Sequence, residues 1–295
     1  MDTKRIPPRA WPIAVTVLWV CAAALRWWQL RSAFEADTGL ARPLAVSSLA
    51  FAAVLLLSGA VLALLARRQS ADPALKDSWE RALYAPGDRL ALAGLVLAAF
   101  LALAAGGVLL RQGLSLFSAW RRARASLGNT AVKANSGLLC LACSLCAVGT
   151  FAALLTAGRR SLRSQRCGGA PLMAAVCGCV WMMDTYRSHA ADPVRWDYVP
   201  LLLAALAGLL FFLDWGGMTC GAPRPYRLLW LAGMTVVLSA AALVGCDEAG
   251  SLLLLACQAI AALTVLYRLP RNLNHPPEAP AQPPREEEVE EEPHV

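Results

Sequence analysis

Histidine and charge are both scarce in this 295-residue chain. Only His189 lies near an apolar segment, and the other two histidines follow the last one. A transmembrane bis-histidine haem and a zinc site of the His-Glu-x-x-His type are therefore excluded. Charged residues make up 16% of the chain, whereas soluble domains contain about 25%. This composition excludes an ordinary soluble domain.

The sequence also lacks the residue patterns of common enzymes. It contains no Gly-rich phosphate loop, no nucleophile elbow and no pair of carboxylates within an apolar segment. We therefore expect a protein that is not an enzyme, with no catalytic residue, no metal and no cofactor. The positive charges lie at the ends of apolar segments and form no stripe interleaved with aromatic residues, which argues against nucleic-acid binding.

Apolar residues are abundant instead, at 58% of the chain, and they are grouped in long blocks. Helices of this length cross a hydrocarbon layer of about 30 Å, and the blocks lack the alternation of a β-barrel. The sequence therefore predicts an all-α, polytopic membrane protein with about eight transmembrane helices. The expected spans are residues 10–25, 44–66, 90–110, 135–157, 170–183, 199–213, 228–244 and 251–267.

Lysine and arginine are distributed unevenly between the loops. With the N-terminus inside, 17 of the 27 basic residues fall in the inner segments. Cytoplasmic loops are enriched in these residues, so we predict that both termini are cytoplasmic, in the plasma membrane of a bacterium. One outer loop, with Arg111, Arg121, Arg122, Arg124 and Lys133, does not fit this rule. Its segment 114–124 combines apolar side chains with clustered arginine and could lie flat in the membrane interface.

Internal similarity between the two halves indicates a duplication of four helices. Val20-Cys21 corresponds to Val176-Cys177, and Cys143 corresponds to Cys257, in the same order along each half. Chance agreement between Ala-rich and Leu-rich helices is the alternative. Basic residues before the first span also resemble a signal peptide, but the duplication requires that span, which favours a retained anchor.

Because four helices per unit is an even number, the two repeats are expected to be parallel, and a ligand site is expected where they meet, by analogy with other repeat proteins. The acidic, proline-rich end of the chain cannot bury a core and should be disordered. The predicted parts are a cytoplasmic N-terminus (1–9), a first repeat (10–160), a basic cytoplasmic linker (161–169), a second repeat (170–269) and a Pro/Glu-rich cytoplasmic tail (270–295).

Three cysteines, Cys140, Cys143 and Cys146, have the two-residue spacing of part of an iron–sulfur ligand set. They fall inside an apolar span, where steps of three residues sweep around a helix, and no fourth cysteine followed by proline completes the set. Cysteine is also a small apolar residue suited to close helix packing. We therefore interpret these cysteines as packing residues.

The outer loops of both repeats combine tryptophan, arginine and acidic residues. Arginine and tryptophan together can hold an anionic group beside an apolar body, such as a lipid headgroup or another amphiphile. The alternative is an aromatic belt with arginines that reach the membrane surface. The candidate ligand-binding residues are Trp28, Arg31, Asp37, Asp184, Tyr186, Arg187, His189 and Asp192.

Two functional hypotheses follow. The first is a permease-like protein, or a binder of a small amphiphilic or anionic ligand, at the interface of the two repeats. The second is a membrane anchor or scaffold subunit of a larger complex, whose function lies in a membrane or cytoplasmic protein partner. Membrane lipids are expected partners in both cases, and the sequence does not identify a ligand.

Overall fold

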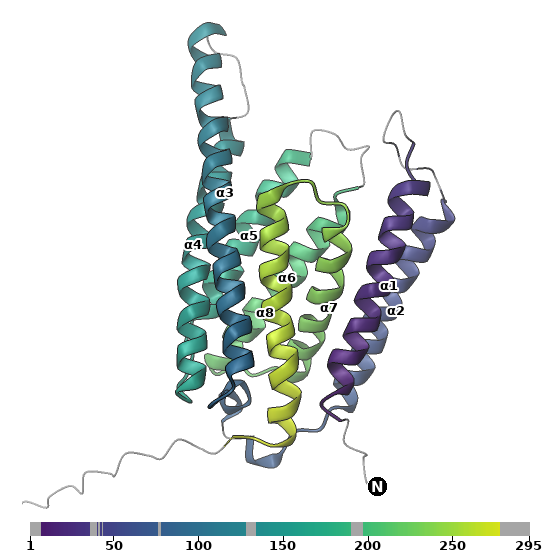
Figure 1. Ribbon diagram of the computed structural model, residues 1–295, viewed down its shortest axis with the longest axis vertical. Helices are drawn as coiled ribbons and strands as arrows, with labels where there is room; N and C mark the ends of the chain where they lie inside the picture. Colours follow the sequence, from purple (N-terminus) through teal and green to yellow (C-terminus); the bar gives the residue numbers. More distant parts are fainter. Residues whose placement is uncertain are drawn as a thin grey trace, which may run out of the picture.

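The computed structural model describes residues 7–35, 40, 42, 44–75, 78–127, 134–189 and 197–277, without the side chains of 123–127 and 134–136. Eight α-helices make up this part of the chain (Figure 1), which confirms the all-α fold. Two short 3-10 turns, η1 (Pro73–Leu75) and η2 (Trp79–Leu83), precede the third helix. The helices are α1 (Ala10–Ser32), α2 (Val46–Arg68), α3 (Arg89–Leu127), α4 (Ala134–Leu162), α5 (Ala170–His189), α6 (Val199–Thr219), α7 (Pro225–Leu243) and α8 (Ala249–Asn274).

Seven of these helices are long and apolar enough to cross a membrane, and α5 is not among them. The chain is therefore a multi-pass membrane protein, as its composition predicts. α5 contains Asp184, Arg187 and His189 near its end, which reduce its apolar length. α5 packs against α4 and α6 and buries one face there, with Val176 and Met183 among its exposed apolar side chains.

The third helix is much longer than its predicted span. α3 has 39 residues, or about 58 Å at 1.5 Å per residue, and it projects beyond the other helices in Figure 1. The expectation that 114–124 lies flat in the interface is wrong, because this segment continues the axis of α3. Two glycines allow this segment to pack closely against α4. A Cβ at Gly113 would lie only 2.8 Å from Leu141 Cγ, and a Cβ at Gly137 would lie 3.3 Å from Phe117 N.

Small residues also allow close contact between α3 and α4 nearer the start of α3. The Cys140 thiol donates to the carbonyl of Leu109 (3.2 Å), and the Ser144 hydroxyl donates to the carbonyl of Gly106 (2.7 Å). Cys140 and Cys143 are both buried, Cys140 against α3 and Cys143 against Cys177 of α5, in agreement with the packing interpretation. Among the described residues, no group of three His, Cys, Asp or Glu side chains is placed to hold a metal ion.

α7 and α8 form the centre of the bundle. α7 packs against α1, α2, α6 and α8, whereas α8 also packs against α3. The α1–α2 pair and the α3–α4 pair therefore lie on opposite sides of the molecule (Figure 1). These contacts do not confirm an arrangement as two four-helix repeats, and the duplication stays a prediction.

The described chain begins and ends on the same side of the bundle. Pro8, before α1, and His275, after α8, line one cavity. α8 continues through Pro270 to Asn274, past the boundary expected for the tail. We call this side the inner end, after its predicted cytoplasmic location, and the opposite side the outer end.

Candidate functional site

Six of the eight residues predicted at the outer ligand site are described, and Asp37 and Asp192 lie outside the described residues. On α1, the Arg31 guanidinium lies over the ring of Trp27, 4.1 Å from its centroid. Trp27 and Trp28 are exposed. This arrangement resembles the aromatic belt, the alternative considered for these residues.

The residues on α5 point in different directions. Tyr186 and Arg187 are exposed. Asp184 lines a cavity of 280 Å³. His189 lines a second cavity of 120 Å³, which shares Glu248 with the first, and stacks on Tyr198 with the ring centroids 4.9 Å apart. α1 packs on α2 and α7 rather than on α5, so the structure does not gather the two halves of the outer set. Ligand binding there stays a prediction.

Arg26 is the most deeply buried of the described charged residues at the outer end, and it is not among the eight residues predicted there. Its side chain is 2% exposed. Nη2 donates to the Asp197 carbonyl (2.6 Å), Nη1 donates to Gln29 Oε1 (2.8 Å), and the guanidinium lies 5.8 Å from the centroid of the Phe51 ring. These contacts connect α1 to α2 and to the start of α6. The helical step of four from buried Ala22 is the signal that could have identified it.

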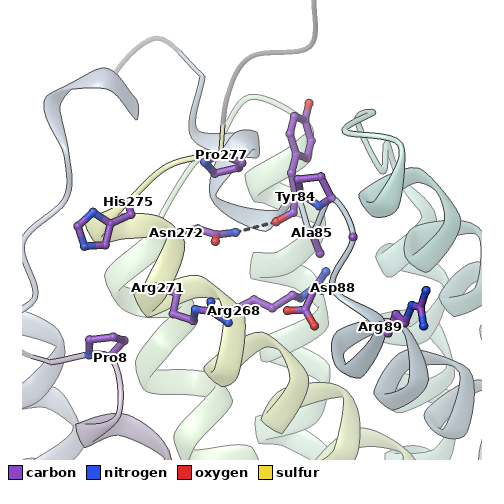
Figure 2. A pocket seen from close by; sticks show the side chains of 12 residues that line it. Pro8, Tyr84, Ala85, Asp88, Arg89, Arg268, Arg271, Asn272, His275 and Pro277 are labelled. Carbon is purple, nitrogen blue, oxygen red and sulfur yellow. Dashed lines mark hydrogen bonds between the residues drawn. The ribbon is translucent and has the colours of Figure 1, made fainter.

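The inner end contains a cavity of 560 Å³, whose walls come from three parts of the chain (Figure 2). They are the segment before α1, the turn before α3 and the last turn of α8 with the residues after it. In the sequence, the arginines of these segments indicate topology and give no local signal of a site. The lining residues are Pro8, Tyr84, Ala85, Pro86, Gly87, Asp88, Arg89, Arg268, Arg271, Asn272, His275 and Pro277.

Hydrogen bonds between side chains and the backbone fix the turn that lines this cavity on the side of α3. Gly87 has φ +73°, a conformation that favours glycine, and it turns the chain into the helix. Asp88 Oδ1 then accepts the N–H of Ala91 (3.1 Å), which is the usual role of an N-cap aspartate. On the facing side, Asn272 Nδ2 donates to the carbonyls of Tyr84 (2.7 Å) and Ala82 (2.9 Å).

Tyr84 lines the cavity beside this turn and is 6% exposed. Burial raises the pKa of its phenol, and the Glu80 carboxylate raises it further. Both causes disfavour the phenolate. Tyr84 therefore adds no negative charge to the cavity at neutral pH.

Arg268 forms the floor of the cavity and is 3% exposed. Its Nη1 donates to Ser161 Oγ (2.7 Å) and to the Leu83 carbonyl (3.3 Å). Its Nε is buried and has no hydrogen-bond partner among the described residues. The ion pairs found in the described part of the chain are Arg166–Glu80 and Arg227–Asp214, so Arg268 makes no direct ion pair there, and the nearby Asp88 carboxylate interacts with it only electrostatically. The Ser161 hydroxyl also donates to the Leu83 carbonyl (2.7 Å).

Positive charge dominates the cavity. Arg268 and Asp88 lie at the centre of Figure 2, Arg271 lies beside them and Arg89 lies at the edge. His275 is on the opposite wall. Asp88, the single acidic residue of the lining, already accepts a hydrogen bond at the start of α3. Three arginines against one carboxylate favour an anionic occupant.

No known protein family, curated protein or solved structure matches this chain. The cavity is therefore interpreted from its own geometry. The feature with the clearest chemical consequence is a buried guanidinium at the base of an open, cationic space.

Proposed function

We propose that this multi-pass membrane protein binds a small anionic ligand with a phosphate-type group in the cavity at its inner end. The observation that carries the proposal is the burial of Arg268 without a direct ion pair, at the floor of a cavity of 560 Å³. The ligand class is the one expected from the sequence, but the site is at the opposite end of the bundle.

Burial of an arginine is costly unless its charge and its donors are satisfied. Removing such an ion from water costs several kcal/mol, and a good partner must offset this. Here the described partners are a hydroxyl and a carbonyl, and Nε is left without one. A phosphate-type oxygen in the cavity would add a direct charged partner to the electrostatic attraction of the nearby Asp88 carboxylate.

The fold itself has little need of the Arg268 charge. If the guanidinium were removed, the Ser161 hydroxyl and the Leu83 carbonyl would keep their hydrogen bond to each other. No described buried group would lose its last partner. A costly charge that the fold does not require is better explained by a ligand than by stability. The proposal assigns binding to this site and no catalysis.

Calorimetric titration of the detergent-purified full chain with glycerol 3-phosphate tests the proposal. We expect binding by the wild type and no binding of glycerol. Arg268→Gln should weaken the binding of glycerol 3-phosphate by about 10- to 100-fold, because it removes a charge-assisted contact of about 1.5–3 kcal/mol.

Arg163→Gln is the matched control, since it removes the same charge from an exposed position at the same end. It should leave the affinity within about twofold, a change well below 1 kcal/mol. Equal losses in the two variants would show general attraction to a basic surface and would contradict a built site.

A scaffold role is the second candidate, and the projection of α3 supports it. A helix of 39 residues is nearly twice as long as a span of about 20 residues requires. The part beyond the bundle offers a surface for a partner protein. Affinity purification in mild detergent, with mass spectrometry of co-purified lipids and proteins, tests both candidates. A stoichiometric protein partner that is lost when 111–133 is deleted would favour the scaffold.

A further inference from the structure

A second cavity adjoins the cationic one. It has a volume of 490 Å³ and is lined by Pro8, Arg9, Pro12, Tyr267 and Arg271. Pro8 and Arg271 also line the cationic cavity, so the two spaces meet at these residues. We call the second space the α1–α8 groove, because its walls are the start of α1 with the residues before it and the last turns of α8.

The groove differs chemically from the cavity that it joins. Pro8, Pro12 and the ring of Tyr267 present carbon atoms to it. Its two arginines, Arg9 and Arg271, are exposed. The combined space is therefore cationic at one end and mostly apolar at the other.

Arg271 is held where the two spaces meet. Its Nη1 donates to the Tyr267 hydroxyl (2.9 Å), and its guanidinium lies 5.5 Å from the centroid of the Tyr267 ring. These contacts use one edge of the guanidinium and leave other donors for a ligand. In Figure 2, Arg271 lies between Pro8 and Arg268, on the path from the groove to the floor of the cavity.

The groove lies between two candidate membrane spans, α1 and α8. A space between transmembrane helices near one membrane surface is open to acyl chains, whereas a soluble phosphate ester would leave it empty. An apolar groove continuous with a cationic pocket matches a molecule with an anionic head and an apolar chain.

We infer that the ligand is an anionic membrane amphiphile, whose phosphate-bearing head lies against Arg268 and Arg271 and whose apolar chain lies in the α1–α8 groove. This inference rests on the proposed function, because it assumes that the cationic cavity binds the head. Beyond the proposed function, it states that the ligand is a lipid and that the lipid enters the site from the membrane between α1 and α8.

Two probes with the same head separate the two ideas. Glycerol 3-phosphate contains the head alone, and oleoyl lysophosphatidic acid adds one chain. Binding of each to the full chain in an uncharged detergent is measured by native mass spectrometry and calorimetry. We expect lysophosphatidic acid to bind at least about tenfold more tightly, a difference of about 1.4 kcal/mol, and Arg268→Gln to weaken both probes.

Pro12→Trp is designed to fill the groove without changing the cationic cavity, because Pro12 lines only the groove. It should remove the advantage of lysophosphatidic acid and leave glycerol 3-phosphate binding unchanged. Val17→Trp, at an exposed position of the same helix, is the control for added bulk and should change neither. Pro12→Ala tests the loss of proline by itself and should also preserve the advantage of the chain.

Three results would overturn the inference. Equal affinity of the two probes for the wild type would identify a soluble phosphate ester and leave the proposed function intact. An advantage of the chain that survives in a correctly folded Pro12→Trp protein would place the chain elsewhere. Failure of both probes to bind would remove the proposed function together with the inference.

Discussion

Within the described part of the chain, each end of the bundle buries one arginine, and the surroundings of the two residues differ. Arg26 at the outer end meets the Asp197 carbonyl, Gln29 and the face of Phe51, beside a cavity of only 120 Å³. Arg268 at the inner end meets a hydroxyl and a carbonyl below a cavity of 560 Å³. Both have a buried Nε without a described hydrogen-bond partner.

The comparison shows that burial alone does not assign a role to an arginine. Arg26 supplies the hydrogen bonds of its neighbours and connects α1 to the rest of the bundle, so its role is structural. Arg268 leaves its neighbours satisfied without it and faces open space, which is the pattern expected of a ligand contact. Substitutions at the two ends should therefore have different consequences.

The largest expected difference is in stability. Arg26→Met leaves the Asp197 carbonyl and Gln29 Oε1 without this donor, and it should lower the free energy of unfolding by about 1.5–3 kcal/mol. Arg268→Met should lower it by less than about 1 kcal/mol, because an apolar side chain often replaces a buried charge at little cost. Thermal unfolding in detergent without added phosphate or lipid measures both. Equal losses would make Arg268 a structural residue and remove the premise of the proposed function.

Cysteine labelling sharpens the comparison at the inner end. Cys167 and Cys220 both lie in inner turns, one buried and the other exposed. Burial raises the pKa of the Cys167 thiol, and the thiolate is the reactive form. A membrane-impermeant maleimide should modify Cys220 at least about tenfold faster than Cys167 at neutral pH.

The difference should persist as the pH rises toward 9, since a raised pKa moves formation of the Cys167 thiolate to higher pH. Cys220→Ala is the control for assignment of the signal. Labelling of Cys220 in inverted vesicles, but not in intact cells, would agree with an inner end in the cytoplasm. Labelling in intact cells would reverse the predicted orientation.

The smallest effect is expected at the outer set. Arg187 is exposed, and an exposed arginine near the membrane surface contributes mainly contacts with headgroups. Arg187→Ala should change the affinity for lysophosphatidic acid by less than about twofold. Titration beside the Arg268→Gln variant provides the reference, and a tenfold loss in Arg187→Ala would place the ligand at the outer end instead.

The positions of the helices could be predicted from the sequence, but the packing of one helix against another could not. Apolar length and composition predicted all eight helices, because each helix satisfies its own backbone hydrogen bonds. The upright course of 114–124 could not be predicted, since it depends on the close approach of α4 at Gly113 and Gly137. Local amphipathic character is the same for a helix that lies in the interface and for one that packs against a partner.

The cationic cavity shows the same limit. The sequence contains its arginines, but nothing local indicates that residues 84–89 meet the end of α8, almost 200 positions away. The outer arginines lie next to tryptophans in the sequence, which is the stronger local signal. The ligand site was therefore predicted at the outer end.

The sequence by itself determined that this protein is helical and crosses a membrane, because apolar length and the cost of unsatisfied backbone act on each segment separately. Only the tertiary structure decided which buried arginine lines a small cavity among neighbours that need its hydrogen bonds, and which lines a large cavity. That distinction depends on hydrogen-bond partners and open space contributed by distant segments, at Asp197 for Arg26 and at Leu83 and Ser161 for Arg268. The physical reason is that burial is a property of packed neighbours, whereas the tendency to form a membrane helix is a property of the segment itself.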